Sequence, residues 1–223
     1  MIVVATLLIM LACAYAQYRN GLFTSVAMLI MVFISGLVAF GFWEPIAESL
    51  DRVFQNNALA GCEDMIALTL LFSVTLFALR LATNYIAPDL IEEHGALQHF
   101  GGAAVGLVTG YFVAGFLICA VQTLPLDERF LGFEPRQPGE PVYRSIYPSD
   151  RVWLTMMRHA GAVPFSWKEE DPEATTSLER YATFDRNGTF ELRYLRYRHG
   201  FQGGGPLPYF GEFDRELGKQ KPR

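Results

Sequence analysis

Apolar residues gather in four long runs along the chain, each close to the length that crosses a bilayer as a helix. About 20 apolar residues span the hydrocarbon core as an α-helix. The runs cover Ile2–Tyr18, Leu22–Trp43, Met65–Ile86 and Gly101–Leu124. The pattern predicts an all-α integral membrane four-helix bundle, which we assign to residues 1–124.

The first run also has features of a cleavable secretory signal, because Ala14-Tyr15-Ala16 has the A-x-A form of a cleavage site. A signal peptide normally begins with a basic region, and no basic residue precedes this run. We therefore expect an uncleaved helix. Only a few residues around Arg19 and Gly21 join it to the second run, so these two helices should form an antiparallel hairpin with its turn there.

The fourth run carries a small residue at every fourth position, namely Gly102, Gly106, Gly110 and Ala114. Positions four apart lie on one face of a helix, and small residues there let a second backbone approach closely. This pattern is typical of a glycine zipper. We expect the face to be a helix-packing surface, either against the chain's own bundle or against an identical subunit.

The segment between the second and third runs is amphipathic. Ile46, Leu50, Val53 and Phe54 recur at helical spacing within the loop expected over residues 44–64. They predict a short helix that lies in the membrane interface or folds back onto the bundle.

Beyond Leu124 the chain becomes polar and rich in proline. Recurrent prolines over residues 125–148 predict an extended linker. Residues 149–202 are expected to form a small soluble α+β module, and residues 203–223, rich in glycine and charge, a disordered tail.

The module should begin with a helix over residues 149–160, capped by Ser149 or Asp150. A second short helix is expected over residues 172–180. Because Asn187-Gly188 lies between two strand-like runs, a β-hairpin should follow, with strands at residues 181–184 and 189–195.

Arginines and tyrosines alternate at the end of the second expected strand, where Arg193, Arg196 and Arg198 follow one another closely. Such a mixture can bind anionic lipid headgroups or a protein partner. Neighbouring acids reduce the net positive charge of this segment, so an ordinary solvent-facing strand is the alternative interpretation.

Charge is divided unevenly along the chain, whose formal net charge is −5. Residues 1–124 contain 3 arginines and 8 acids, whereas the remainder contains 15 basic and 15 acidic residues. No concentrated basic surface follows from this distribution, which disfavours a nucleic-acid partner. The expected partners are the lipid bilayer and either a second copy of the chain or another membrane protein.

Arg80 is the one ionisable residue set inside an apolar run. An intramembrane charge is a candidate functional group. However, Arg80 lies about six residues from the end of its run, so its side chain can also reach the headgroup layer by snorkelling. It is thus a candidate contact for a headgroup or a partner.

Catalytic and metal chemistry are not indicated by the spacing of reactive residues. The acids lie in loops, and the serines of the apolar runs have no intramembrane histidine or lysine to activate them. Asp89, Glu92, Glu93 and His94 follow one another too closely to converge on a metal ion with His99. We therefore expect no enzyme activity, no cofactor and no metal.

The three cysteines are also expected to be free. Cys13 and Cys119 lie inside apolar runs, and Cys62 lies in a polar loop. Their spacing is not that of metal ligands.

Two segments of residues 1–124 resemble the colicin V production protein family. Residues 18–23, Tyr-Arg-Asn-Gly-Leu-Phe, are similar to the family's arginine–glycine turn, and residues 97–110 to the entry into its glycine-stepped last helix. This chain has Gln98 and His99 where the family usually has an aspartate and a basic residue. It has Thr109 where the family has another basic residue.

The resemblance implies a non-enzymatic protein of the bacterial inner membrane, linked to production or export of a peptide toxin and more broadly to envelope physiology. A homo-oligomeric channel lined by the glycine face of the fourth helix is the alternative. The acidic second loop and the uncharged N-terminus favour a C-terminal tail outside the cytoplasm.

Overall fold

The computed structural model describes residues 1–54, 61–86, 96–127, 129–134, 136, 148–161, 165, 184–185 and 189–201. Its elements are α1 (Ile2–Asn20), α2 (Leu22–Phe54), α3 (Glu63–Ile86), α4 (Ala96–Gln122), the 3-10 turn η1 (Phe130–Gly132), α5 (Ser149–Ala160) and α7 (Phe190–Phe201). The described part of the chain is therefore mostly helical and contains no strand.

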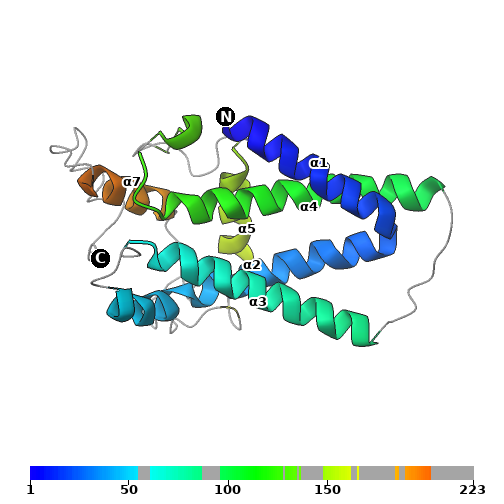
Figure 1. The fold of residues 1–223 in the computed structure, drawn as a ribbon, viewed down its shortest axis with the longest axis horizontal. Helices are drawn as coiled ribbons and strands as arrows, with labels where there is room; N and C mark the ends of the chain where they lie inside the picture. Colours follow the sequence, from blue (N-terminus) through cyan, green and yellow to red (C-terminus); the bar gives the residue numbers. More distant parts are fainter. Residues whose placement is uncertain are drawn as a thin grey trace, which may run out of the picture.

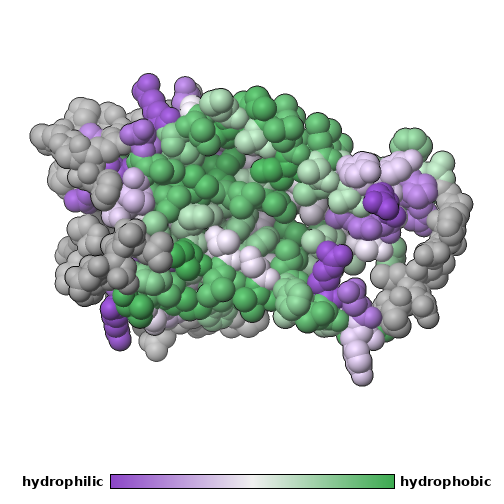
Figure 2. Space-filling model, viewed as in Figure 1, coloured by the Kyte–Doolittle hydropathy of each residue, from purple (hydrophilic) through white to green (hydrophobic). Residues whose placement is uncertain are grey.

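The four long helices α1 to α4 are each long and apolar enough to cross a membrane, which confirms the prediction of four long apolar helices. Their axes lie along the length of the molecule in Figure 1, with successive helices running in opposite directions. Figure 2 shows an apolar surface across the middle of this face, with hydrophilic side chains at both ends. This distribution of polarity suits a bilayer, where apolar side chains meet acyl chains and polar ones meet the headgroups.

The helices do not pack in chain order. α1 packs chiefly against α4, α4 also packs against α2, and α2 packs against α3. Gly21, with a φ of 81°, reverses the chain between α1 and α2, a backbone conformation that glycine adopts without strain. The two helices run antiparallel from this turn (Figure 1), but they make few direct contacts with one another.

α2 is longer than the sequence pattern indicated. It continues through Pro45 to Phe54 as one helix, where a separate loop helix was expected. Proline removes one backbone hydrogen bond and normally ends or kinks a helix. Here the next turn is held by packing, because Ala47 is buried and Ile46 and Leu50 contact the main core.

The expected β-hairpin is wrong, because its second strand lies in helix α7. The Oδ1 atom of Asp185 accepts hydrogen bonds from the backbone N–H groups of Thr189 (2.6 Å) and Phe190 (2.9 Å). Asp185 thereby satisfies donors that the start of a helix leaves unpaired. The first helical hydrogen bond then runs from the N–H of Arg193 to the carbonyl of Thr189.

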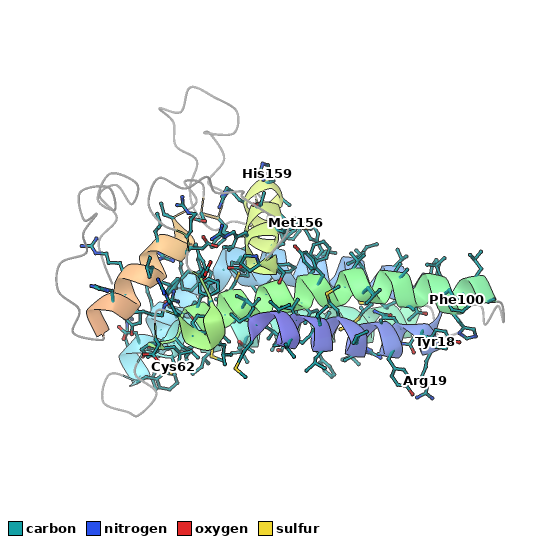
Figure 3. All side chains as sticks on the ribbon, turned by 90° about the horizontal axis from the view of Figure 1, so that it is seen from above. Tyr18, Arg19, Cys62, Phe100, Met156 and His159 are labelled. Carbon is teal, nitrogen blue, oxygen red and sulfur yellow. The ribbon has the colours of Figure 1, made fainter. Side chains whose placement is uncertain are left out.

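α5 covers the residues expected for it, but its cap differs. Pro148 occupies the N-cap position, and no side chain caps the helix. Asp150 instead accepts a hydrogen bond from Gln122. Figure 3 shows α5 projecting to one side of the four long helices, with His159 towards its outer end.

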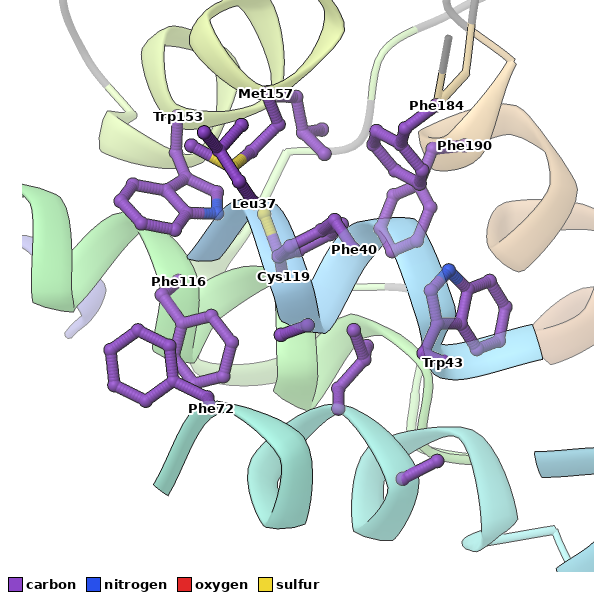
Figure 4. Close-up of a cluster of buried hydrophobic side chains, with 14 of the residues drawn as sticks. Leu37, Phe40, Trp43, Phe72, Phe116, Cys119, Trp153, Met157, Phe184 and Phe190 are labelled. Carbon is purple, nitrogen blue, oxygen red and sulfur yellow. The ribbon is translucent and has the colours of Figure 1, made fainter. Parts of the chain in front are cut away.

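The main core joins α5 and α7 to the long helices. Trp153, Met157 and Leu154 of α5 lie in one cluster with Phe40 of α2 and Phe116 of α4, as Figure 4 shows for the labelled members. The ring of Phe40 contacts those of Phe116, Trp153, Phe184 and Phe190 with centroids 4.8–6.3 Å apart. The polar C-terminal half thus contributes to the same core as the membrane helices.

Several expectations fall outside the described residues. They are the helix at 172–180, most of the first hairpin strand at 181–184, the tail at 203–223 and most of the linker at 125–148.

Candidate packing surface and buried polar cluster

The glycine face of α4 lies against the backbone of α1. A methyl group added at Gly102 would lie 2.6 Å from the carbonyl oxygen of Gln17. At Gly106 it would lie 2.7 Å from the Cα of Ala14, and at Gly110 2.6 Å from the Cα of Met10. These distances leave no room for a side chain, so the close approach of the two helices depends on glycine at all three positions.

The same face continues towards the end of α4 with Ala114, which is 1% exposed. The buried side chains of α1 include the polar residues Thr6 and Gln17, each 5% exposed. The partner that this structure places on the glycine face is therefore a helix of the same chain.

Two further glycines make room for α5. A methyl group at Gly115 of α4 would lie 2.7 Å from the carbonyl oxygen of Ser149 and 3.0 Å from the Cβ of Trp153. One at Gly36 of α2 would overlap the indole ring of Trp153. Trp153 is fully buried between these helices, and it fixes the position of α5 across them.

The turn between α1 and α2 is tied to the start of α4. The Oε1 atom of Gln98 accepts a hydrogen bond of 3.0 Å from the N–H of Leu22, at the first residue of α2. The Nδ1 atom of His99 lies 2.8 Å from the carbonyl oxygen of Tyr18. Gln98 and His99 therefore hold backbone groups of the turn between α1 and α2.

The arginines singled out in the membrane half lie at one end of the molecule. Arg19 is exposed beside Tyr18 (Figure 3), and Arg80 is exposed on α3. Neither is brought into contact with the glycine face of α4. Their positions near the ends of apolar helices suit contact with lipid headgroups.

A buried polar cluster lies at the opposite end, where α4 meets α5 and α7. We define it as six side chains that are at most 6% exposed: Gln122, Arg136, Asp150, Arg151, Glu191 and Arg198. Three arginines and two acids thus share an interior that favours uncharged groups. Such groups persist in a fold only when they pair with one another or with polar atoms.

Gln122 connects the elements of this cluster. Its Nε2 atom donates a hydrogen bond of 2.6 Å to Oδ2 of Asp150. Its backbone carbonyl accepts a hydrogen bond from Nη1 of Arg198, whose guanidinium also lies 5.6 Å from the ring centroid of Phe130. The end of α4 is therefore bonded to both α5 and α7.

Glu191 is the second acid of the cluster. Its Oε2 atom lies 3.8 Å from Nε of Arg136, and its Oε1 atom lies 3.7 Å from Nε of Arg151. Burial is the main cause that raises the pKa of Glu191 to about 8, with a further contribution from the charge of Asp150, against the opposing pull of Arg151 and Arg136. Burial likewise raises the pKa of Asp150.

Further polar contacts hold α7 in place around the cluster. Arg158 of α5 forms an ion pair of 3.1 Å with Asp185, the residue that caps α7. The hydroxyl of Tyr194 donates a hydrogen bond of 2.6 Å to Asp64 at the start of α3. α7 is thereby fixed to two other helices.

The arginines expected on a strand take different positions on α7. Arg193 lies over the ring of Trp43 at 5.3 Å and 3.7 Å from a carboxylate oxygen of Glu44. Arg196 is partly exposed, whereas Arg198 is fully buried. Sequence reasoning missed the polar cluster to which Arg198 belongs. The seven-residue spacing of Glu191 and Arg198 would have indicated a shared helix face, had the helix been recognised.

Metal ligands do not converge in the described ranges, where no group of three or more His, Cys, Asp and Glu side chains could hold an ion. Asp89, Glu92, Glu93 and His94 lie outside those ranges. Cys13, Cys62 and Cys119 are free cysteines.

The apolar helices, their polar ends and the close α1–α4 contact together define a polytopic α-helical membrane protein. The family model of the colicin V production protein matches residues 3–135. The chain therefore belongs to the colicin V production protein family. No curated protein and no solved structure matches it.

Proposed function

We propose that this chain is a non-enzymatic protein of the bacterial inner membrane that acts in toxin production or export, or more broadly in envelope physiology, by binding a partner protein. Membership of the colicin V production protein family supports this role. The observation that supports the non-enzymatic part of this proposal is the use of polar and small residues for helix packing in the described structure. Gln122, Asp150 and Gln98 bond helix to helix, and the glycines of α4 admit α1. These residues serve packing.

The role in export is tested in a toxin-producing strain from which the gene has been deleted. Toxin should accumulate in the cells and fall in the medium, and the wild-type chain should restore its release. Gly106→Leu should not restore release, because a large side chain at a close helix contact costs about 1–3 kcal/mol by analogy with overpacked cores. Unchanged toxin in the medium of the deletion strain would overturn the export role.

A homo-oligomeric channel lined by the glycine face of α4 is the alternative function. The position of α1 on that face does not support it, because α1 would have to leave before the face could line a pore. Purified chain in planar bilayers should show no conductance above background. Reproducible conductance that Gly106→Leu alters would replace the export proposal with the channel.

We also propose that the C-terminal half lies outside the cytoplasm. In a cysteine-free background, Ser49→Cys places a single thiol near the C-terminal end of α2, and Asn20→Cys places one at the end of α1, next to the start of α2; both residues are exposed. An impermeant thiol reagent added to intact cells should label Ser49→Cys and spare Asn20→Cys. The reverse pattern would place the C-terminal half in the cytoplasm.

A further inference from the structure

Glu191 carries a carboxylate enclosed where α7 meets the rest of the polar cluster. The residue is 4% exposed. The Nε atom of Arg151 lies 3.7 Å from its Oε1 atom, and the Nε atom of Arg136 lies 3.8 Å from its Oε2 atom. Both distances are longer than the roughly 2.7–2.9 Å of a charge-assisted hydrogen bond. Within the described structure, its Oε1 atom has no hydrogen-bond partner. The Oε1 atom is thus removed from water without the close bonds that stabilise a buried negative charge.

The acids and bases around Glu191 come from α5 and from the segments that precede α5 and α7. Asp150 and Arg151 belong to α5, Arg136 precedes α5, and Asp185 precedes α7. The two aspartates disfavour a further negative charge, while the two arginines favour it. Arg198 stands two turns further along α7, bonded to the carbonyl of Gln122.

We propose that Glu191 is a proton-binding site and that loss of its proton weakens the docking of α7 on α4 and α5. This inference goes beyond the proposed role in export and does not depend on it. The ligand is a proton that passes between solvent and the carboxylate, so a neutral carboxylic acid becomes a carboxylate and no other bond is made or broken.

The coupling to docking follows from burial. While protonated, Glu191 adds no charge to the interior. Once ionised, it becomes the third negative group beside Asp150 and Asp185, and its Oε1 atom requires a donor closer than the Nε atom of Arg151 at 3.7 Å. Water supplies such donors when α7 moves outward. The helix should therefore open more often as the proton is lost.

Infrared difference spectroscopy on the full chain in nanodiscs tests the proton site directly, between about pH 6 and about pH 9. A protonated carboxylic acid has a carbonyl stretch that a carboxylate lacks. We expect such a band to titrate near pH 8 and to be absent in Glu191→Gln. In Asp150→Asn it should persist with a lower midpoint, because the charge of Asp150 contributes to the raised pKa of Glu191. The exposed Glu48→Gln is the matched control and should keep the band.

Hydrogen exchange over the same range tests the coupling. Backbone amides of α7 should exchange faster above the midpoint in the wild type and in Glu48→Gln. In Glu191→Gln they should stay protected, because the amide mimics the neutral acid. Absence of the band, its loss in Asp150→Asn, or the same pH-dependent exchange in Glu191→Gln would overturn the proposal. If Glu191→Gln does not fold, the titration of the wild type and Asp150→Asn still decides the site.

Discussion

Gln122 and Asp150 form the bond that joins the last residue of α4 to the first turn of α5, with 2.6 Å between Nε2 and Oδ2. Both side chains are fully buried. Gln122→Ala should lower the free energy of unfolding by about 1–3 kcal/mol, because it leaves a buried acceptor without its donor. Thermal unfolding in detergent measures the loss.

A double-mutant cycle separates this bond from other effects. Gln122→Ala combined with Asp150→Ala should cost less than the sum of the single changes, because the shared hydrogen bond is lost only once. Ser49→Ala removes an exposed hydroxyl bonded to the carbonyl of Pro45 and should change stability by less than about 0.5 kcal/mol. Strict additivity of the pair would show that the two residues do not interact.

Asp185 should be required for the first turn of α7. Asp185→Ala removes the cap and should cost about 0.5–2 kcal/mol, seen as faster hydrogen exchange at Phe190 and the residues that follow. Asp185→Asn keeps an acceptor oxygen and tolerates the left-handed φ of 45° at this position. Equal exchange in the two variants would exclude the capping role.

Gln98 should stabilise the turn between α1 and α2 through its acceptor oxygen. Gln98→Glu keeps that acceptor beside the start of α2, where a negative charge is favourable, so it should retain the wild-type melting temperature. Gln98→Ala should lower it, by an amount typical of losing a helix cap, about 0.5–2 kcal/mol. The control is Leu97→Ala at a neighbouring exposed residue. A loss in Gln98→Glu as large as in Gln98→Ala would contradict this role.

Stability should depend on pH through Glu191. Its pKa is raised from 4.5 to about 8 in the folded chain, so the folded state holds the proton more tightly than the unfolded state. The resulting stabilisation is complete below about pH 4.5 and is lost as the pH rises through about 8. The melting temperature of the wild type should therefore fall across this window, and that of Glu191→Gln should fall less. Parallel pH profiles would show that the ionised carboxylate is tolerated.

The membrane half could be predicted from sequence because its signal is local. An apolar run of spanning length has few alternatives to a membrane helix. The continuation of α2 past Pro45 could not be predicted in this way, because it is supported by contacts of Ala47 with residues distant in the sequence. The segment of α7 is predicted as a strand because it follows Asn187-Gly188 and because Phe190, Leu192 and Tyr194 alternate with polar residues. In the helix these three side chains are buried together with Leu195 and Glu191, so the alternation reflects burial on several sides of a helix.

The polar cluster could not be found in the same way. Its members extend from Gln122 to Arg198 and are assembled only when α5 and α7 fold against the end of α4. Charged residues in a polar segment are normally exposed, so nothing in their local pattern indicates burial. The glycines of α4 were visible as a pattern, whereas the identity of the helix against them depends on packing out of chain order.

The central claim, that the glycine face of α4 accommodates the backbone of α1, is tested most directly by the same substitution at two adjacent residues. A methyl group at Gly102 meets the backbone oxygen of Gln17 at 2.6 Å, whereas one at Gly101 meets the flexible end of Leu22 at 3.1 Å. In thermal unfolding of the full chain, Gly102→Ala should be destabilising. Gly101→Ala should be neutral or stabilising, because alanine is the better helix former by about 1 kcal/mol. Equal effects at the two positions, or a gain in stability for Gly102→Ala, would contradict the account.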